Sequence, residues 1–402
     1  MQISYVNYKK LDQGTRLDAE YYKPKFLEVE KLLRKANCKL LDDISKSIKS
    51  FGAYSLCNEM VFVDKGIPFI RCKDIKEGFV DFSDVLFINE ATHRLLSKSA
   101  VSPNTVMLTM SGTVGNSTIA NPTWKYPINS NQDIAKIETN EVINPHYLTI
   151  FLNGKYGKSQ TERLPIGSIQ QHIFIWQLKG LLILVASKSF QEIIANLYIK
   201  ATKLLSDSEV LYRVAEEAIL SELGLLNWKP KHRLSFVKKF SDTQASQRID
   251  AEYFQPMYEE VIKAVKSAKN CICLGDIVSI KKCIEPGSKA YQENGIPFLR
   301  VSNLSKFGIN NNNQQYISES LYESLKTHQP KKGEILMSKD ATPGIAYYFK
   351  DSPCKMIPSG GILRLNVKNS ENIYPEYLTL VLNSVIVQKQ IERDAGGSMA
   401  LS

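Results

Sequence analysis

The sequence predicts an α+β protein in which two repeated mixed α/β domains are joined by a long coiled-coil-type helix. Three observations lead to this fold class. Sequence landmarks recur at an offset near 230 residues, short β-branched and aromatic runs alternate with Gly, Asn and Pro clusters, and residues 190–223 contain neither Pro nor Gly.

The composition is that of a folded basic protein. The 402 residues are 43% apolar and 23% charged, with a net charge of +10 and a pI near 9.0. This apolar content excludes wholesale disorder, and the surplus of Lys and Arg favours a polyanionic partner. The sequence has no apolar run of about 20 residues, and its first ten residues lack the apolar core of a signal peptide. The seven cysteines form no Cys-x-x-Cys pair, so we expect buried thiols in a cytoplasmic protein.

Five landmarks recur in one order and establish the repeat. They are RLDAEYYKP at 16–24 and RIDAEYFQP at 248–256, GIPFIR at 66–71 and GIPFLR at 295–300, Met110-Ser111 with Gly115 and Met337-Ser338 with Gly344, PHYLTIFLN from 145 and PEYLTLVLN from 375, and Gly167-Ser168 and Gly397-Ser398. A period this long is not that of a solenoid. We therefore expect an N-terminal segment (1–15), a first domain (16–175), a spacer strand and helix (176–235) and a second domain (236–402).

The segments between the landmarks diverge. The asparagine run 310–313 has no counterpart near Phe82. Residues 339–343 stand where the first copy has Thr113-Val114, and this segment is predicted to be two residues longer. A shared scaffold with different loops suggests two related surfaces that bind different targets, although drift of the loops without functional meaning is the alternative.

Each predicted domain begins with a helix, at 19–35 and 252–269, with Pro24 in a first turn or a kink. Strands follow at PFIRC, VMLTM and AKIET in the first copy and at PFLRV, EILMS and GILRLNV in the second. Pro145 and Pro375 then favour the first turn of a further helix.

The spacer helix is predicted over 190–223, with Gly224 as its stop. Its apolar positions alternate in steps of four and three, which is the seam of a coiled coil, and we take Phe190, Ile194, Leu197, Leu204 and Leu211 as the partner-binding seam. The helix would be about 51 Å long. A helix packed on its own domain is the alternative. Because the second copy is followed by no comparable helix in this sequence, we expect another chain to cover the seam, or the sequence to be shortened.

Catalytic motifs are weak or missing in the sequence. Asn144-Pro145-His146-Tyr147 imitates the motif of adenine methyltransferases, but the second copy lacks it and no Gly-x-Gly loop accompanies it. There is no phosphate-binding loop of the ATPase type and no His-Glu-x-x-His zinc motif. The repeated pairs Asp18/Glu20 and Asp250/Glu252 are expected at helix N-termini, not at a nuclease metal.

Binding to DNA is the function that remains. The Ser111–Gly115 turn follows an apolar strand, so its N–H groups could approach a phosphate, and its counterpart adds a cation. Since an Arg present in both copies is a poor reader of different bases, Arg71 and Arg300 are expected to contact phosphate or the scaffold, with specificity in the divergent loops. The candidate DNA-binding residues are Arg71, Lys73, Ser111, Thr113, Arg300, Asn303, Ser338 and Lys339.

The whole chain resembles the specificity subunit of type I restriction–modification systems, which defend cells against foreign DNA. The resemblance rests on the R-x-DAEYY/F-x-P openings, the GIPF-x-R strands, LTMSGTVG and ILMSKDATPG, and GSIQQHI before a helix that starts with Phe190-Gln191-Glu192. Two departures are that 181–189 lacks the family's proline and that the second spacer helix is absent.

The resemblance implies two target-recognition domains that each read half of a bipartite double-stranded DNA site, held apart by the helix. It implies methyltransferase and restriction subunits as partners, and no catalytic group, metal or cofactor in this chain. S-adenosylmethionine, ATP and Mg would be bound by the partners. A recognition module of another DNA-modifying defence system, a stand-alone nuclease or methyltransferase, and an RNA-binding scaffold are the alternative functions.

Overall fold

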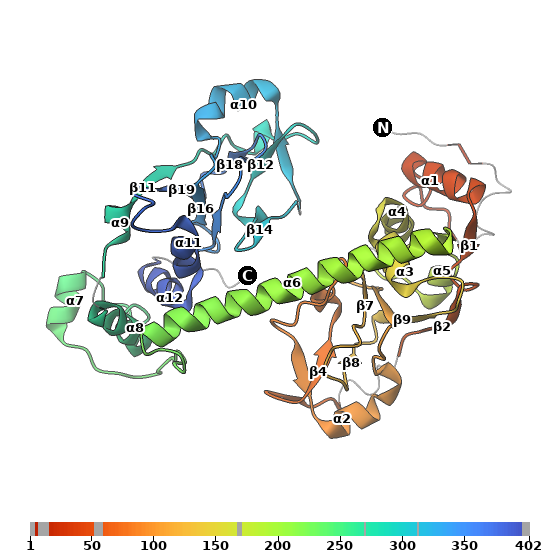
Figure 1. Cartoon of the computed structure of the whole chain (residues 1–402), viewed down its shortest axis with the longest axis horizontal. Coiled ribbons are helices and arrows are strands. Elements are labelled where there is room, and N and C mark those ends of the chain that lie inside the picture. The colour runs from red at the N-terminus through yellow and green to blue at the C-terminus, as the bar shows by residue number, and fades with distance from the viewer. Residues whose placement is uncertain are drawn as a thin grey trace. The chain divides into compact units, whose positions relative to one another are not determined.

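The computed structural model describes residues 5–6, 16–51, 59–166, 171–268, 271–311 and 313–395. The chain forms two compact units, Met1–Ser208 (unit 1) and Glu209–Ser402 (unit 2). One continuous helix, α6 (Lys188–Glu222), begins in unit 1 and ends in unit 2 (Figure 1). The division therefore falls inside the helix that the sequence predicts at 190–223.

Unit 1 is built on two small sheets. The first is antiparallel with the order β2-β9-β6-β7, and the second has the order β3-β5-β4-β8, in which β4 and β8 are parallel. The elements of unit 1 are α1 (Pro24–Lys35), β1 (Cys38–Leu40), β2 (Ser45–Lys49), β3 (Phe62–Val63), β4 (Ile67–Ile70), β5 (Leu86–Ile88), α2 (Glu90–Leu95), β6 (Val106–Thr109), β7 (Ser117–Ile119), β8 (Asn129–Ser130), β9 (Ile134–Thr139), α3 (Pro145–Asn153), α4 (Lys155–Arg163), α5 (Ile175–Lys179) and β10 (Leu182–Leu184).

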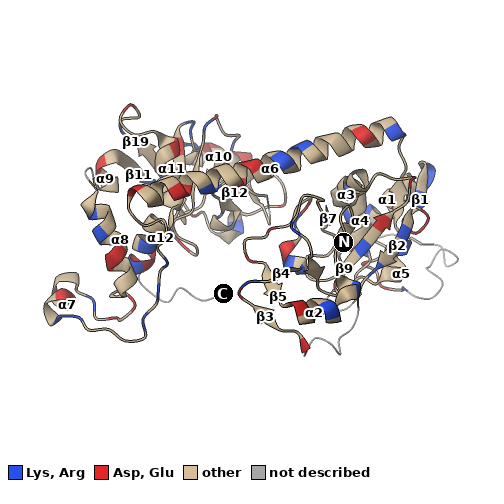
Figure 2. Cartoon of the chain, turned by 60° about the horizontal axis from the view of Figure 1, so that its bottom comes forward, with Lys and Arg blue, Asp and Glu red and all other residues tan. Residues whose placement is uncertain are grey.

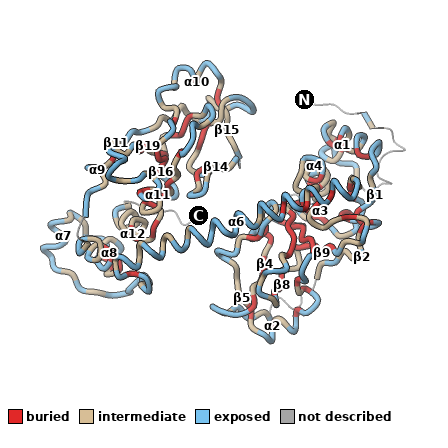
Figure 3. The backbone as a smooth tube through the Cα atoms, viewed as in Figure 1, coloured by how far each residue is buried: buried red, intermediate tan, exposed pale blue. Residues whose placement is uncertain are grey.

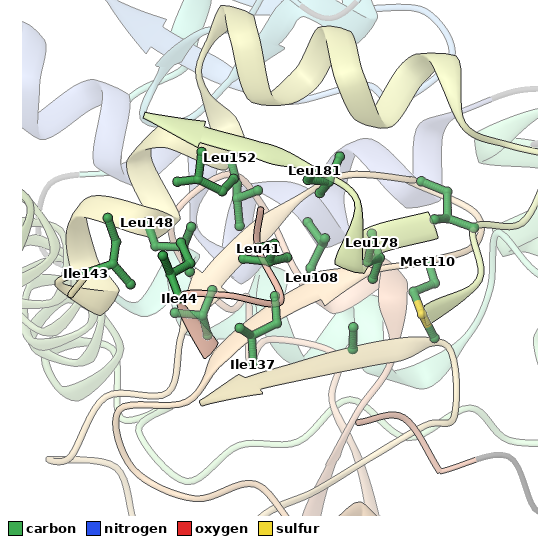
Figure 4. Close-up of a cluster of buried hydrophobic side chains, with 14 of the residues drawn as sticks. Leu41, Ile44, Leu108, Met110, Ile137, Ile143, Leu148, Leu152, Leu178 and Leu181 are labelled. Atoms are coloured by element: carbon green, nitrogen blue, oxygen red, sulfur yellow. The ribbon is translucent and has the colours of Figure 1, made fainter. Parts of the chain in front are cut away.

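The first sheet of unit 1 is buried on both faces. Along β6, Val106 and Leu108 belong to one core cluster, and Met107, between them, belongs to another. The first cluster packs against Leu148 and Leu152 of α3 (Figure 4), and the second reaches the strand β4. Because both faces are covered, the strand reads as a continuous apolar run in the sequence.

Unit 2 repeats this arrangement. Its sheets have the orders β11-β19-β16-β17 and β15-β12-β18, and β12 and β18 are parallel, as β4 and β8 are. The predicted fold class, two repeated mixed domains and a long joining helix, is therefore confirmed. The elements of unit 2 are α7 (Phe240–Ser246), α8 (Pro256–Ser267), α9 (Leu274–Ile277), β11 (Val278–Lys282), β12 (Ile296–Leu299), β13 (Leu304–Ser305), β14 (Gly308–Ile309), β15 (Gln315–Ile317), α10 (Glu319–Leu325), β16 (Glu334–Ser338), β17 (Ala346–Tyr348), β18 (Ile357–Pro358), β19 (Ile362–Val367), α11 (Pro375–Asn383) and α12 (Val385–Asp394).

The turn after β6 and the turn after β16 have the same length, so the predicted two-residue insertion is wrong. The Gly115 N–H donates to the Thr109 carbonyl at 3.0 Å, and the Gly344 N–H donates to the Ser338 carbonyl at 2.8 Å. Gly112 and Ala341 both have positive φ, 68° and 57°. The structural counterpart of Ser338 is therefore Thr109, and Ser111 corresponds to Asp340. The Met-Ser pair present in both copies led the sequence comparison to the wrong register.

The repeated GIPF and PxYLTxxLN motifs support the sheets. A Cβ on Gly66 would lie 2.4 Å from the Ile88 carbonyl oxygen of the neighbouring strand, and Gly295 is equally close to Ile317. Asn153, at the end of α3, accepts a hydrogen bond from the Ser117 N–H at 2.8 Å and donates to the Ser117 carbonyl at 2.7 Å. Asn383 of α11 makes the same two hydrogen bonds to the backbone of Ala346. These repeated residues are therefore scaffold.

The repeated RxDAEY motif forms a turn before the first helix. The helices start at Pro24 and Pro256, so the predicted starts at 19 and 252 are too early. Asp18 accepts the Arg16 side chain at 2.6 Å and the Tyr21 N–H at 3.0 Å, which lowers its pKa. The expectation that it lies at a helix N-terminus is wrong: it closes the preceding turn. Arg163 of α4 stacks on Tyr21 with 3.9 Å between the guanidinium carbon and the ring centroid, which packs α4 against this turn.

The ends of α6 are packed, whereas its middle is exposed (Figure 3). In unit 1, Gln191, Ala195 and Tyr198 are buried, and the Tyr198 hydroxyl donates to the Gly78 carbonyl at 2.5 Å. In unit 2, the last turns join a cluster with Val261 of α8 and Ile386 of α12, and Gly224 follows the helix with φ 68°. The alternative of a helix packed on its own domain therefore holds for its two ends only.

Two buried cations occupy equivalent positions in the sheets and differ in their partners. Arg364 of β19 makes a two-pronged ion pair with Glu334 at 2.8 and 2.9 Å, and both side chains are buried. Lys136 of β9 lies opposite Met107 of β6, just as Arg364 lies opposite Leu336 of β16. Among the residues described, Lys136 donates only to the Ser130 hydroxyl, at 2.9 Å. Burial lowers the pKa of Lys136 from 10.5 to about 8.

Unit 1 is expected to gain stability as the pH rises from about 8 to 10.5. In this window the unfolded chain keeps the Lys136 proton and the folded chain has lost it, so the free energy of unfolding increases by about 3 kcal/mol across the window. Lys136→Met should remove this pH dependence and stabilise unit 1 at pH 7. Hydrogen exchange of peptides covering β6 and β9 measures the effect. Lys49→Met, at the exposed cross-strand neighbour of Lys136, is the control and should leave the slope intact; an unchanged slope in Lys136→Met would contradict the assignment.

Candidate nucleic-acid interface

Two turns meet at one end of unit 1 and bring four of the predicted DNA-binding residues together. One is the 3-10 turn Cys72–Asp74, which follows β4 and Arg71 and contains Lys73. The other follows β6 and contains Ser111 and Thr113. The Thr113 hydroxyl donates to the Cys72 carbonyl at 3.3 Å, which fixes the two turns to one another.

The equivalent turns also meet in unit 2. A Cβ on Gly361 would lie 2.9 Å from the Val301 side chain and 3.3 Å from the Asp340 carboxylate, so the turn after β12 and the turn after β16 share one neighbourhood. The Lys339 N–H also donates to the Gly361 carbonyl at 2.9 Å. The turns that carry Arg300, Asn303, Ser338 and Lys339 therefore lie together in unit 2, as the equivalent turns do in unit 1.

The cations of the first site are already paired. Arg71 donates from Nε and Nη2 to Asp74, both at 3.0 Å, and Asp74 is only 4% exposed. Lys73 contacts Asp84 at 2.7 Å. The hydrogen bonds that Arg71 donates to Asp74 raise the pKa of Arg71, and those that Asp84 accepts from Lys73 and Arg71 lower the pKa of Asp84. This turn is therefore close to electrical neutrality, and the sequence analysis missed both aspartates, although Asp74 is three residues from Arg71.

The second site differs from the first in its charge. Asn303 stands where unit 1 has Asp74, and its side-chain oxygen accepts the Arg300 N–H at 3.0 Å. Arg300 forms no ion pair within the described ranges. Lys339 contacts the neighbouring Asp340 at 3.0 Å. Of the four predicted cations, Arg300 is therefore the one without a carboxylate partner in the part of the chain that is described.

The small polar residues of the sites are mostly inside the turns. Ser111, Asn303 and Ser338 are buried, and the Ser338 hydroxyl donates to the Thr342 carbonyl at 2.6 Å. Thr113 is partly exposed. Figure 2 shows Lys, Arg, Asp and Glu interspersed over both units. The geometry therefore gives the buried residues a positioning role, and leaves the exposed cations and divergent loops to face a ligand.

The seam residues of α6 lie at the surface. Leu197, Leu204 and Leu211 are 59%, 59% and 68% exposed, and Phe190 is 49% exposed. Ile194 instead packs against the core of unit 1. Four of the five predicted seam residues are thus available to a partner.

The remaining motifs show no catalytic arrangement. Asn144 caps α3, because its side-chain oxygen accepts the His146 and Tyr147 N–H groups at 2.9 and 3.4 Å. The resemblance of this segment to a methyltransferase motif is thus explained by a helix cap. The described residues contain no group of three or more His, Cys, Asp or Glu side chains suited to a metal ion. Among the described helices, none is long and apolar enough to cross a membrane. The Gly167-Ser168 and Gly397-Ser398 landmarks lie outside the described residues.

Comparison with known proteins gives one family match, which lies within the second unit. Residues 267–399 match the family of the type I restriction modification DNA specificity domain. No match is found among curated proteins. The part of unit 2 that contains β11 to α12 is thus similar to a DNA specificity domain.

Structural comparison gives distant matches. The type I restriction–modification S subunit from M. genitalium is 16% identical, with 88% of this chain and 78% of that chain covered and a TM-score of 0.35. The HsdS subunit from Thermoanaerobacter tengcongensis is 14% identical, with coverage of 89% and 82% and a TM-score of 0.30. The family match is therefore the informative comparison: residues 267–399 are similar to the type I restriction modification DNA specificity domain.

Proposed function

We propose that the chain reads a bipartite target in double-stranded DNA, one half with each unit, and directs methyltransferase and restriction subunits to it. One observation carries the proposal: the strand order of the matched DNA specificity domain in unit 2 recurs in unit 1. A protein that contains such a domain twice, with different loops, is suited to two different half-sites.

The physical properties of the chain support this proposal. A net charge of +10 attracts the phosphate backbone without regard to sequence, and loops at the ends of strands then contact base edges. A helix of 35 residues is about 52 Å long, more than the ~34 Å between successive turns of the major groove. The exposed leucines of α6 would bind the partners. S-adenosylmethionine, ATP and Mg belong, in this proposal, to the partner subunits.

Methylation mapping tests the proposed function. In cells that contain the partner subunits, adding this chain should produce methylated adenines in a two-part sequence with a fixed gap, and omitting it should abolish them. The purified assembly should also bind that sequence more tightly than unrelated duplex DNA at the same salt concentration. Methylation that is identical with and without the chain would refute the proposal, as would an assembly that does not bind duplex DNA.

A further inference from the structure

Arg71 and Arg300 occupy the same place in the two units. Arg71 follows β4, which pairs in parallel with β8, and Arg300 follows β12, which pairs in parallel with β18. Each arginine donates from Nη2 to the backbone carbonyl thirteen residues later, at Asp84 and Asn313. The backbone around the two guanidinium groups is therefore alike. A difference in their chemistry has to come from the side chains around them.

In unit 1 these side chains neutralise the arginine. Asp74 binds the guanidinium with both oxygens, and one of them also accepts the Arg71 backbone N–H at 2.8 Å. Asp84 lies 3.4 Å from Nη2 and also pairs with Lys73. Two carboxylates thus face two cations. A phosphate that approached Arg71 would have to compete with a buried carboxylate.

In unit 2 asparagines replace both aspartates. The single side-chain oxygen of Asn303 is used by the Arg300 backbone N–H, and its amide group donates to the Asn310 carbonyl at 3.2 Å. The Arg300 Nε is buried and has no hydrogen-bond partner among the described residues. A guanidinium left in this state is costly unless a ligand completes it.

A second cation, Lys306, lies six residues further along, in the turn between β13 and β14. The Lys306 ammonium lies over the Tyr212 ring at 4.3 Å and over the Phe307 ring at 5.0 Å, and it forms no ion pair within the described part of the chain. Arg300 and Lys306 are therefore two positive charges that no carboxylate within 4.0 Å offsets among the described residues. An anion is the ligand that this arrangement favours, and the planar fork of Arg300 matches a phosphate.

We infer, on the basis of the proposed function, that Arg300 is a phosphate-contacting residue of unit 2, whereas Arg71 is a structural residue of unit 1. Asn303 is then the positioning residue that leaves the Arg300 charge available. The two units share one scaffold and use the same arginine for different purposes. A contact to phosphate strengthens binding to every DNA sequence, and so it does not specify bases.

Binding of the full assembly to its duplex target tests the inference, with affinity measured over a series of salt concentrations. Arg300→Gln should weaken binding about tenfold, and the slope of log affinity against log salt should fall by about 0.9. Asn303→Asp should have the same effect, because the new carboxylate can take the guanidinium as Asp74 does. Combining the two substitutions should give no further loss.

The matched control is Arg71→Gln together with Asp74→Asn, which removes the whole pair and leaves no buried charge uncompensated. It should change affinity less than twofold and leave the salt slope unchanged. Hydrogen exchange verifies that each variant is folded.

Three results would overturn the inference: unchanged affinity in Arg300→Gln, equal losses in Arg300→Gln and the control, or a changed methylated sequence, which would indicate a base contact. If the unaltered assembly fails to bind its duplex, it is the proposed function that fails.

Discussion

Exchanging residues 67–165 for the corresponding segment of a homologous chain should change one half of the methylated sequence completely and leave the other half as it was. The segment contains the strands from β4 to β9 of unit 1 and the loops that connect them, in which the specificity of this unit is proposed to lie. Unit 2 keeps its own strands and loops. Methylome sequencing of cells with the exchanged chain measures the result.

The design of the exchange follows from contacts that cross its boundaries. Arg163 lies inside the segment and donates to Glu30 at 2.6 Å and to the Tyr21 carbonyl at 2.7 Å, both outside it. Arg16, also outside, donates to the Leu164 carbonyl at 2.9 Å. A donor segment that retains an arginine at 163 keeps α1 attached. Re-introducing the original segment is the control, and a simultaneous change in both halves of the target would contradict the assignment of one half to each unit.

Replacing Leu197, Leu204 and Leu211 with lysine should abolish assembly with the methyltransferase subunits. The three side chains are exposed and follow one another at seven-residue intervals, so they form one stripe that a partner helix could cover. Three ammonium groups in such a contact would lose their hydration without gaining a counter-charge. Light scattering coupled to size-exclusion chromatography measures the mass of the assembly.

The control separates a loss of the seam from an effect of added charge. Ile199→Lys with Ser206→Lys adds lysines two residues further along the same helix, about 200° around its axis from the seam. Both positions are exposed, so the two units should fold as before. We expect this variant to assemble normally. Assembly that survives the three leucine substitutions would show that α6 is not the contact surface.

Sequence reasoning predicted the scaffold well because the scaffold is periodic and occurs twice. The strand at Val106, the helix starts at Pro145 and Pro375 and the stop at Gly224 each depend on local chemistry that a sequence displays. The repeat then supplied the long-range order, because two copies of one pattern imply two copies of one fold.

The candidate site could be predicted only in part. Arg71 and Arg300 were found from the repeat, but their different states depend on Asp74 against Asn303 and on the Asp84 carboxylate, which lies thirteen residues from Arg71. Only the folded chain brings Asp84 next to Arg71, and no local sequence pattern predicts this contact. The seam of α6 was likewise predictable only in part. The heptad spacing predicts an apolar stripe, whereas the packing of Ile194 on unit 1 depends on the tertiary fold.

The glycine and asparagine contacts that both units share have an evolutionary consequence. The glycines, Gly66 and Gly295, let neighbouring strands approach closely. The asparagines, Asn153 and Asn383, hold a helix to the backbone of a strand. Mutations that remodel the connecting loops therefore leave these contacts in place. If each unit reads one half of the target, as proposed, a lineage carrying this gene can acquire a new specificity in one half while these contacts are retained.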